Sequence, residues 1–188
     1  MMRFLLDGML GKLSRWLRIL GHEAQYLKNG SDKKLLSHAK DDSLILLTSD
    51  AQLYRTAISK GVESFLINSK DNPERLADLA HRFNLKLEID LTQSRCPTCG
   101  SPIKPILKDK ATNSVPPTSF KVYQSFWACT NNSCAKLYWQ GSHWKKIEET
   151  LRNAREILER KQNRSIPLAG RGANTRSIGA TSSHNFLT

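Results

Sequence analysis

Long apolar runs are absent from this sequence of 188 residues, although hydrophobic residues make up 39% of it, enough for a folded core. No run of strictly apolar residues exceeds four, as at residues 44–47, whereas a membrane-spanning helix needs about 20. Asp7 and Gly8 interrupt the first apolar stretch, which is therefore too short for a signal peptide. We therefore expect a cytoplasmic protein that does not enter the membrane.

Acidic residues are scarce in the second half of the sequence. Residues 93–146 hold eight Lys and Arg but one acid, Asp109, whereas residues 1–92 hold 14 basic and 12 acidic residues. Much of the net charge of +12 is thus concentrated in one stretch. A concentrated positive charge favours a polyanionic partner such as nucleic acid, and the alternative is an ordinary solvated surface.

Cysteine is also rare, and the four cysteines form two pairs. Two residues separate Cys96 from Cys99, and four separate Cys129 from Cys134. Two close pairs of this kind converge on one tetrahedral Zn²⁺ in zinc ribbons. Disulfides and a redox Cys-x-x-Cys motif are the alternatives, but nothing indicates secretion and a redox motif leaves the second pair unexplained. The spacing therefore predicts a structural zinc site.

The segment around the cysteines has the pattern of a small β-rich zinc ribbon at residues 93–146. Short apolar segments at residues 103–107, 115–117 and 123–127 predict strands interrupted by prolines. Aromatic side chains lie among the lysines of this segment. They either stack on nucleobases while the lysines contact phosphates, or cap a small core held by the metal. These aromatic residues are Trp127, Tyr138, Trp139 and Trp144.

The first ninety residues alternate between strand and helix patterns. Apolar segments predict strands at residues 3–6, 25–27, 44–48 and 64–67. Helical spacing of apolar residues between them predicts helices at residues 13–20, 32–40, 51–60 and 73–83. Strands separated by helices of this length indicate an α/β domain with a small parallel sheet at residues 1–92. A C-terminal helix is expected at residues 147–161, starting as early as residue 142, and a disordered basic tail at 162–188.

Three aspartates are expected at one edge of this sheet. Asp7 ends the first strand, Asp50 follows the third, and Asp32 opens the helix after the second. Ligands of open α/β sheets gather beyond the carboxyl ends of the strands. Clustered carboxylates bind Mg²⁺ or Mn²⁺, which can activate water for attack on a phosphodiester. The alternative is that Asp32 and Asp50 are helix N-caps, whereas Asp7 has no evident capping role.

Basic residues follow Asp7 along the first predicted helix at steps of three. Lys12, Arg15 and Arg18 avoid the apolar positions of this helix and are expected to face solvent near the acids. They form either a solvated face or a clamp for phosphate. Lys12 and Arg15 lie nearest the start of the helix and are therefore candidate substrate-binding residues.

Two segments, FLLDGMLGKLSRWLRILG at residues 4–21 and LLTSD at residues 46–50, resemble the first and second acidic motifs of the mut-seven C-terminal RNase domain family. The resemblance covers residues 3–150. It continues through SRCPTCG (94–100), VPP (115–117), FWAC (126–129) and YWQGSHW (138–144). It implies a three-layer PIN-like nuclease domain joined to a zinc ribbon, which together act as a metal-dependent ribonuclease.

The resemblance also implies roles for individual residues. Asp7, Asp32 and Asp50 are the expected catalytic acids and ligands of Mg²⁺ or Mn²⁺, and RNA is the expected partner. Thr48 is a supporting hydroxyl, which we group with Lys12 and Arg15 among the substrate-binding candidates. PIN nucleases usually carry a fourth acid, for which Asp71 is the best candidate.

Two other classes of protein share parts of this pattern. The first is a catalytically inactive module that binds RNA or associates with the ribosome. The second is a receiver-type phosphorylation domain, which also has aspartates at strand ends but explains neither the ribbon nor the basic first helix.

Overall fold

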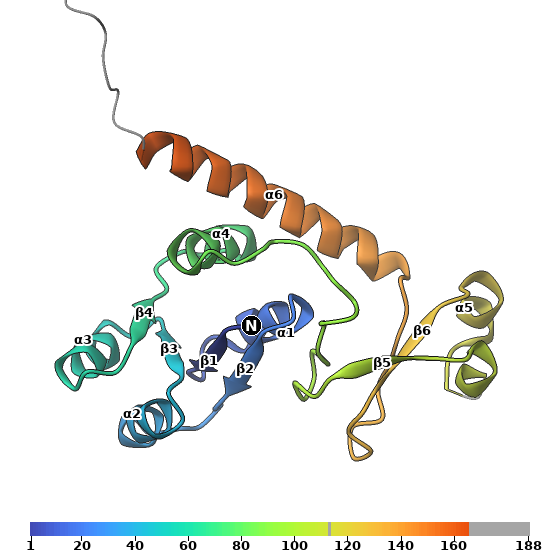
Figure 1. The fold of residues 1–188 in the computed structure, drawn as a ribbon, viewed down its shortest axis with the longest axis horizontal. Coiled ribbons are helices and arrows are strands. Elements are labelled where there is room, and N and C mark those ends of the chain that lie inside the picture. The colour runs from blue at the N-terminus through green and yellow to red at the C-terminus, as the bar shows by residue number, and fades with distance from the viewer. Residues whose placement is uncertain (113, 166–188) are drawn as a thin grey trace, which may run out of the picture.

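The computed structural model describes residues 1–112 and 114–165 of the chain (Figure 1). In the first part of the chain, strands and helices alternate as the sequence predicts. These elements are β1 (Arg3–Leu6), α1 (Gly11–Ile19), β2 (Glu23–Tyr26), α2 (Asp32–Asp41), β3 (Ile45–Thr48), α3 (Ala51–Ser59), β4 (Ser64–Leu66) and α4 (Asn72–Phe83). The strands form a parallel sheet in the order β2-β1-β3-β4.

The side chains of β1 divide between two apolar cores, one on each face of the sheet. Phe4 and Leu6 pack with residues of α1 and α4, whereas Leu5 packs with residues of α2 and α3. All three side chains are fully buried. Because helices cover both faces, residues 4–6 of the strand are all apolar rather than alternating with polar residues. The predicted α/β class, with a parallel sheet between two helical layers, is therefore confirmed.

The alternative that Asp32 and Asp50 are helix N-caps holds for one of the two aspartates. Asp50 is the N-cap of α3, where its Oδ1 accepts hydrogen bonds from the backbone N–H groups of Gln52 and Leu53. Asp32 is not the N-cap of α2, because Ser31 takes this position and accepts a hydrogen bond from the N–H of Lys34. Asp32 is instead the first helical residue, which leaves its carboxylate free of the capping bond.

The second part of the chain forms a separate antiparallel sheet. Strands β5 (Ile103–Ile106), β6 (Phe126–Cys129) and β7 (Leu137–Tyr138) pair in the order β5-β6-β7. A 3-10 turn, η1 (Lys108–Ala111), and a short helix, α5 (Pro117–Val122), lie between β5 and β6. The strand predicted at residues 115–117 is therefore wrong. Pro117 instead starts α5, a position where the missing N–H of proline costs no helical hydrogen bond.

The C-terminal helix returns to the α/β layers. Helix α6 (Ser142–Ser165) runs from the ribbon across α4 (Figure 1). Leu151 and Ala154 of α6 are buried in the same core as Phe4 and Leu6. The helix extends four residues past the predicted end at residue 161. The rest of the tail, for which disorder is expected, lies outside the described residues.

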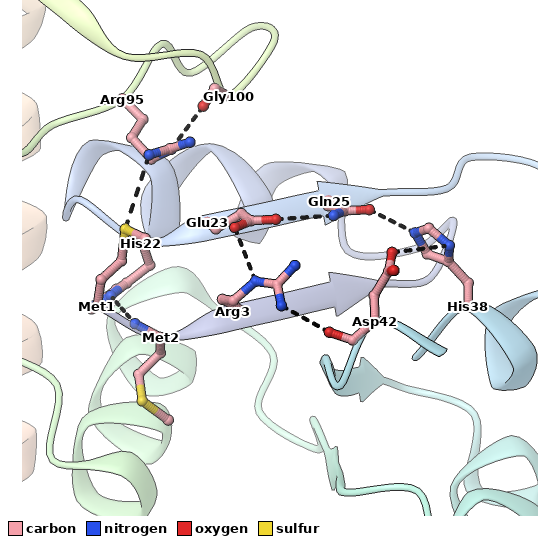
Figure 2. Close-up of polar contacts among 10 residues, drawn as sticks. All are labelled: Met1, Met2, Arg3, His22, Glu23, Gln25, His38, Asp42, Arg95 and Gly100. Carbon is pink, nitrogen blue, oxygen red and sulfur yellow. Dashed lines mark hydrogen bonds and ion pairs between the residues drawn. The ribbon is translucent and has the colours of Figure 1, made fainter. Parts of the chain in front are cut away.

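A polar network links β1 and β2 to the C-terminal end of α2 (Figure 2). Arg3 of β1 donates to the Glu23 carboxylate of β2 at 3.1 Å and to the backbone carbonyl of Asp42 at 2.8 Å. Gln25 of β2 donates to Glu23 and contacts the His38 ring of α2 at 2.6 Å. The network ties the edge strand β2 to β1 and α2 with polar contacts.

Candidate active site and metal centre

The order of the strands creates a switch point between β1 and β3. From β1 the chain moves outward to β2, and from β3 it moves in the opposite direction to β4. Open α/β sheets bind ligands outside the carboxyl ends of the strands at such a point. Asp7 directly follows β1 and Asp50 lies two residues after β3. Both predicted acids therefore lie at the position that this topology favours for a ligand.

Asp7 is buried, with 6% of its surface exposed, and its carboxylate holds the two neighbouring loops together. Its Oδ1 accepts a hydrogen bond from the N–H of Met9 at 2.9 Å. Its Oδ2 accepts from the Thr48 hydroxyl and from the N–H of Ser49 at 3.2 Å. The expectation that Asp7 caps no helix holds, because Leu10 is the N-cap of α1 and no side chain accepts a capping bond there. A carboxylate offers about four acceptor directions, so these three bonds leave room for about one further ligand.

Thr48 connects the two acids. Its hydroxyl donates to Asp7 and accepts a hydrogen bond from the N–H of Asp50 at 2.9 Å. Thr48 has no exposed surface, so its burial favours a supporting role over direct contact with a substrate. Asp50 is exposed, and the capping bonds of α3 fall on its Oδ1. Its Oδ2 has no hydrogen-bond partner among the described residues and is available to a ligand.

Asp32 and Asp71 lie at the same edge of the sheet but take no part in this network. Asp32 is exposed, and its carboxylate accepts no hydrogen bond from any described residue. Asp71 caps α4 by accepting from the N–H of Glu74 at 2.9 Å. Across residues 1–112 and 114–165, the four cysteines form the one tight group of three or more potential metal ligands. The structure therefore joins Asp7, Thr48 and Asp50 but does not gather the three predicted metal-binding aspartates into one cluster.

The loop that carries Asp7 fits closely against the end of β2. The Tyr26 hydroxyl donates to the carbonyl of Gly8 at 2.9 Å. A Cβ at Gly8 would collide with the carbonyl oxygen of Lys28, and one at Gly11 would lie 2.9 Å from the Tyr26 ring. Glycine at these two positions allows the close approach, which sets where Asp7 and the start of α1 lie.

The basic residues of α1 divide into two groups. Lys12 and Arg15 are exposed near the start of the helix, whose first turn contains no acid, and neither pairs with a described residue. Arg18 is buried, with 7% of its surface exposed, so the expectation that it faces solvent is wrong. It lies on the side of α1 that the ribbon covers, a contact that helical spacing does not reveal.

Arg18 joins the α/β layers to the cysteine turn. Its Nε donates to the carbonyl of Ala24 in β2 at 2.8 Å. Its Nη1 donates to the carbonyls of Pro97 and Thr98, between the first two cysteines, at 3.1 and 3.0 Å. Gly100 completes the fit, because a Cβ there would lie 3.2 Å from Nε and its φ of +84° favours glycine. One side chain thus bridges the two parts of the protein.

The charge of Arg18 matters to the same joint. Burial lowers the pKa of Arg18, and the negative charge of the Cys96 and Cys99 thiolates opposes this shift. Arginine nevertheless stays protonated in proteins. Backbone contacts continue the joint, because the N–H of Arg95 donates to the carbonyl of Arg18 and the Ser94 hydroxyl donates to that of Ile19.

The four cysteines form a site that can bind a metal ion. All four Sγ atoms lie within 4.8 Å of one another. The Sγ atoms of Cys96 and Cys134 are 3.7 Å apart, and those of Cys99 and Cys129 are 3.4 Å apart. A tetrahedral zinc ion with Zn–S bonds of about 2.3 Å places sulfurs about 3.8 Å apart, so the spacing fits this ion. The cysteines are free, and these distances far exceed the roughly 2.05 Å of a disulfide bond.

The thiols of this site differ in acidity. Burial acts to raise the pKa of Cys99, but hydrogen bonds from Ser101, Cys129 and Cys96 together outweigh it and bring the pKa down to about 6. Burial raises the pKa of Cys129 to about 12, and the neighbouring sulfurs add to the rise. Because a metal binds thiolates, its binding releases protons from the more basic thiols. Metal affinity is therefore expected to fall as the pH is lowered.

The ribbon aromatics also divide into groups. Trp127 and Tyr138 pack around the cysteines, and the Tyr138 hydroxyl lies 2.9 Å from Cys96 Sγ. This packing agrees with the alternative that the aromatics cap a small metal-held core. Trp139 packs instead against Phe126, with ring centroids 6.4 Å apart, and belongs to a second small cluster. Trp144 lies on α6, where its Nε1 donates to Glu148 at 2.6 Å.

Comparison with known proteins agrees with these features. Comparison with family models matches residues 2–151 to the Mut7-C RNAse domain, the family that the sequence motifs resemble. Searches against curated proteins and solved structures return no match. In the part of the chain that the structure describes, no helix is long and apolar enough to cross a membrane. The match spans the α/β layers, the four cysteines and the first turns of α6, and the chain therefore belongs to the Mut7-C RNAse domain family.

Proposed function

We propose that this protein is a metal-dependent ribonuclease that hydrolyses phosphodiester bonds at the switch point between β1 and β3. The observation that carries the proposal is the Asp7–Thr48–Asp50 network at this position, in a chain of an RNase-domain family. A PIN-like fold is part of the proposal, supported by the parallel α/β sheet and by acids that follow its strands.

Each acid can offer a different oxygen to a bound cation. Asp50 offers Oδ2 while α3 holds its Oδ1, and Asp7 offers the one acceptor direction that its hydrogen bonds leave open. Asp32 is exposed and can complete the ligand set from the start of α2. Mg²⁺ or Mn²⁺ bound here would lower the pKa of a water molecule and stabilise negative charge on the phosphate. Thr48 keeps the Asp7 carboxylate oriented throughout.

The substrate-binding residues follow from exposure and charge. Lys12 and Arg15 project from the exposed side of α1, which begins four residues after Asp7. Both side chains can contact the phosphates on either side of the bond that is cut. The basic ribbon assists by attracting RNA, because residues 93–146 carry eight basic residues and one acid.

The four-cysteine site is assigned to structural Zn²⁺. All four ligands come from the protein and their spacing fits tetrahedral zinc, which leaves no position open for a substrate. Such a site needs reduced thiols, which supports a cytoplasmic location.

An inactive RNA-binding module is the second candidate. Two observations favour it: three hydrogen bonds occupy Asp7, and the three aspartates are not gathered into one cluster among the described residues. Such a module would bind RNA with a strong dependence on salt and show no turnover that depends on a divalent cation.

The test uses Asp50→Asn and Asp32→Asn in a cleavage assay with Mg²⁺ or Mn²⁺ on single-stranded and structured RNA. Asparagine caps helices as well as aspartate does, so Asp50→Asn removes a charge and is expected to leave folding intact. We expect both variants to lose at least a hundredfold in cleavage rate while their RNA affinity stays the same. Asp7→Asn should also abolish cleavage, but it breaks hydrogen bonds to Thr48 and Ser49 and is therefore less clean.

Asp41→Asn is the matched control, because Asp41 is exposed at the opposite end of α2 from Asp32. It should cleave as fast as the unmodified protein. If Asp50→Asn and Asp32→Asn also cleave at full rate, the acid-site mechanism is wrong. If the unmodified protein binds RNA but never cleaves it, the inactive module is the correct assignment.

A further inference from the structure

A small hollow lies where the ribbon meets the start of α6. Its volume is about 360 Å³, at the lower end of the roughly 300–1,000 Å³ typical of ligand pockets. Three segments meet around it: the end of α5, the end of β7 and the first residues of α6. The lining includes Ser119, Tyr123, Tyr138, Trp139, Ser142 and His143. Aromatic rings thus surround a space large enough for a flat, partly polar ligand.

Two of these rings have one packed side and one accessible side. Tyr123 and Trp139 pack against the cluster around Phe126, yet both are only half-buried. Among the described residues, no atom pairs with the Tyr123 hydroxyl or Trp139 Nε1 through a hydrogen bond. The ring nitrogens of His143 likewise have no such partner in this part of the chain. The hollow therefore combines aromatic faces for stacking with polar ring edges that have no protein partner.

Gly141 leaves room for the indole edge of Trp139. A Cβ at this position would lie 2.8 Å from Trp139 Nε1 and 3.7 Å from the Tyr123 hydroxyl. The backbone therefore passes directly beside the indole edge, which only glycine permits without a shift. Any side chain at Gly141 would push the indole out of its present position and change the shape of the hollow.

The charge next to the hollow suits an anion. Helix α6 begins with Ser142 and His143, and its first turn contains no acid. Lys145 and Lys146 follow, and positive charge at the start of a helix opposes the helix dipole. An anionic group bound at this end would relieve that repulsion.

We propose that this hollow binds an unpaired nucleobase of single-stranded RNA, with the base stacked on Trp139 and Tyr123 and the adjoining phosphate at Lys145 and Lys146. Aromatic side chains stack on any base through its π-face, and lysines beside them contact phosphate. The ring nitrogens of His143, which also lines the hollow, supply hydrogen bonds to the edge of the stacked base. The ribbon then fixes one nucleotide of the strand, in addition to attracting RNA through its charge.

The inference rests on the proposed function in taking RNA as the ligand, but its test needs no turnover. Equilibrium binding of a single-stranded oligoribonucleotide is measured without added Mg²⁺ or Mn²⁺, beside binding of inorganic polyphosphate. Trp139→Ala should weaken RNA binding by roughly 5- to 100-fold, the loss expected for one stacked base. Polyphosphate affinity should not change, because polyphosphate has charge but no bases.

Trp144→Ala is the matched control, since the Trp144 indole donates a hydrogen bond to Glu148 and does not line the hollow. It should bind RNA like the unmodified protein. Gly141→Ala should weaken RNA binding by displacing the indole while keeping every aromatic residue. Photo-crosslinking of RNA to the unmodified protein gives a result that no folding defect can affect, and we expect the crosslinks on Tyr123 or Trp139.

The outcomes separate this inference from the ribonuclease proposal. Equal losses of RNA and polyphosphate binding in Trp139→Ala, or crosslinks that avoid the hollow, would overturn the nucleobase site. RNA binding that depends on Trp139 in a protein without cleavage activity would support this site and contradict the ribonuclease proposal. Normal cleavage, together with RNA binding that Trp139→Ala and Gly141→Ala leave unchanged, would support the ribonuclease proposal and contradict the nucleobase site.

Discussion

The α/β layers and the ribbon are stabilised in different ways. The parallel sheet is enclosed by two apolar cores in which β1 and β3 are buried on both faces. Within its described residues the ribbon has only two small clusters, one of them centred on the cysteines themselves. A region with so little apolar burial needs a further source of stability, and a metal ion bound by four thiolates can supply it. The two regions should therefore respond to different perturbations.

The difference in burial also matches the roles proposed for the two regions. Rigid packing around β1 and β3 can hold Asp7 and Thr48 in a fixed geometry, as a catalytic site requires. The ribbon instead exposes basic and aromatic side chains on short strands and turns, which suits contact with a flexible nucleic acid strand. The two regions meet at Arg18, so this residue is where their coupling can be measured.

Removal of the metal should have the largest effect and should affect one region only. Structural zinc contributes roughly 10–16 kcal/mol of binding free energy in small zinc domains, so its loss is expected to unfold the ribbon. A strong chelator, acid near pH 5 or Cys99→Ser should produce this result. The measurement is zinc content, expected at about one ion per chain, together with amide hydrogen exchange in each region.

Exchange should become fast in β5, β6 and β7 while β1 and β3 stay protected. Loss of protection in both regions at once would show that the stability of the α/β layers also depends on the metal. A metal-free protein with two disulfides would overturn the zinc assignment.

Arg18→Met should have an intermediate effect, because it breaks the joint between the regions. It leaves the carbonyls of Ala24, Pro97 and Thr98 without their donor, at an expected cost of about 2–3 kcal/mol. It also removes the positive charge beside Cys96 and Cys99 and should speed the release of zinc to a chelator. Urea unfolding and the rate of zinc release measure the two effects.

Arg15→Met is the control for this joint, because Arg15 lies on the same helix and is exposed. Its stability and rate of zinc release should stay close to those of the unmodified protein. Equal behaviour of the two variants would mean that Arg18 does not couple the regions.

The smallest effect concerns pH and the α/β layers alone. Burial, together with the charge of the N-terminus, lowers the pKa of His22 from 6.5 to about 4. The unfolded chain therefore binds a proton at His22 that the folded chain does not bind. The contribution of His22 to the free energy of unfolding is complete above about pH 6.5 and declines as the pH falls toward 4. Partial exposure of the ring reduces the expected loss to about 1 kcal/mol between pH 7 and pH 5.

His22→Gln should reduce this loss between pH 7 and pH 5, whatever its effect at a single pH. Hydrogen exchange of β1 and β3 at both pH values is the measurement, because it reports on these strands separately from the ribbon. An unchanged difference between the two pH values in the variant would contradict the role of His22.

Local patterns predict most of the architecture. The continuous apolar runs of β1 and β3 are typical of parallel strands covered on both faces, and the cysteine spacing indicates one metal site. The strands, and each cysteine pair by itself, depend on residues close together in the chain. The prediction is weaker at Pro117, where short proline-rich segments allow either a strand or a helix start, and at Asp32, where the neighbouring Ser31 takes the cap.

Composition and spacing alone thus establish the α/β class, the basic character of the ribbon and the positions of the acids just after the strands. They do not establish that Arg18 is buried, that Asp7 is held by Thr48, or that Tyr123 and Trp139 border one hollow. Each of these features joins residues far apart in the chain, and their contact depends on how whole elements pack. Chain patterns reflect local energetics, whereas burial and pairing across elements are set by the packed fold.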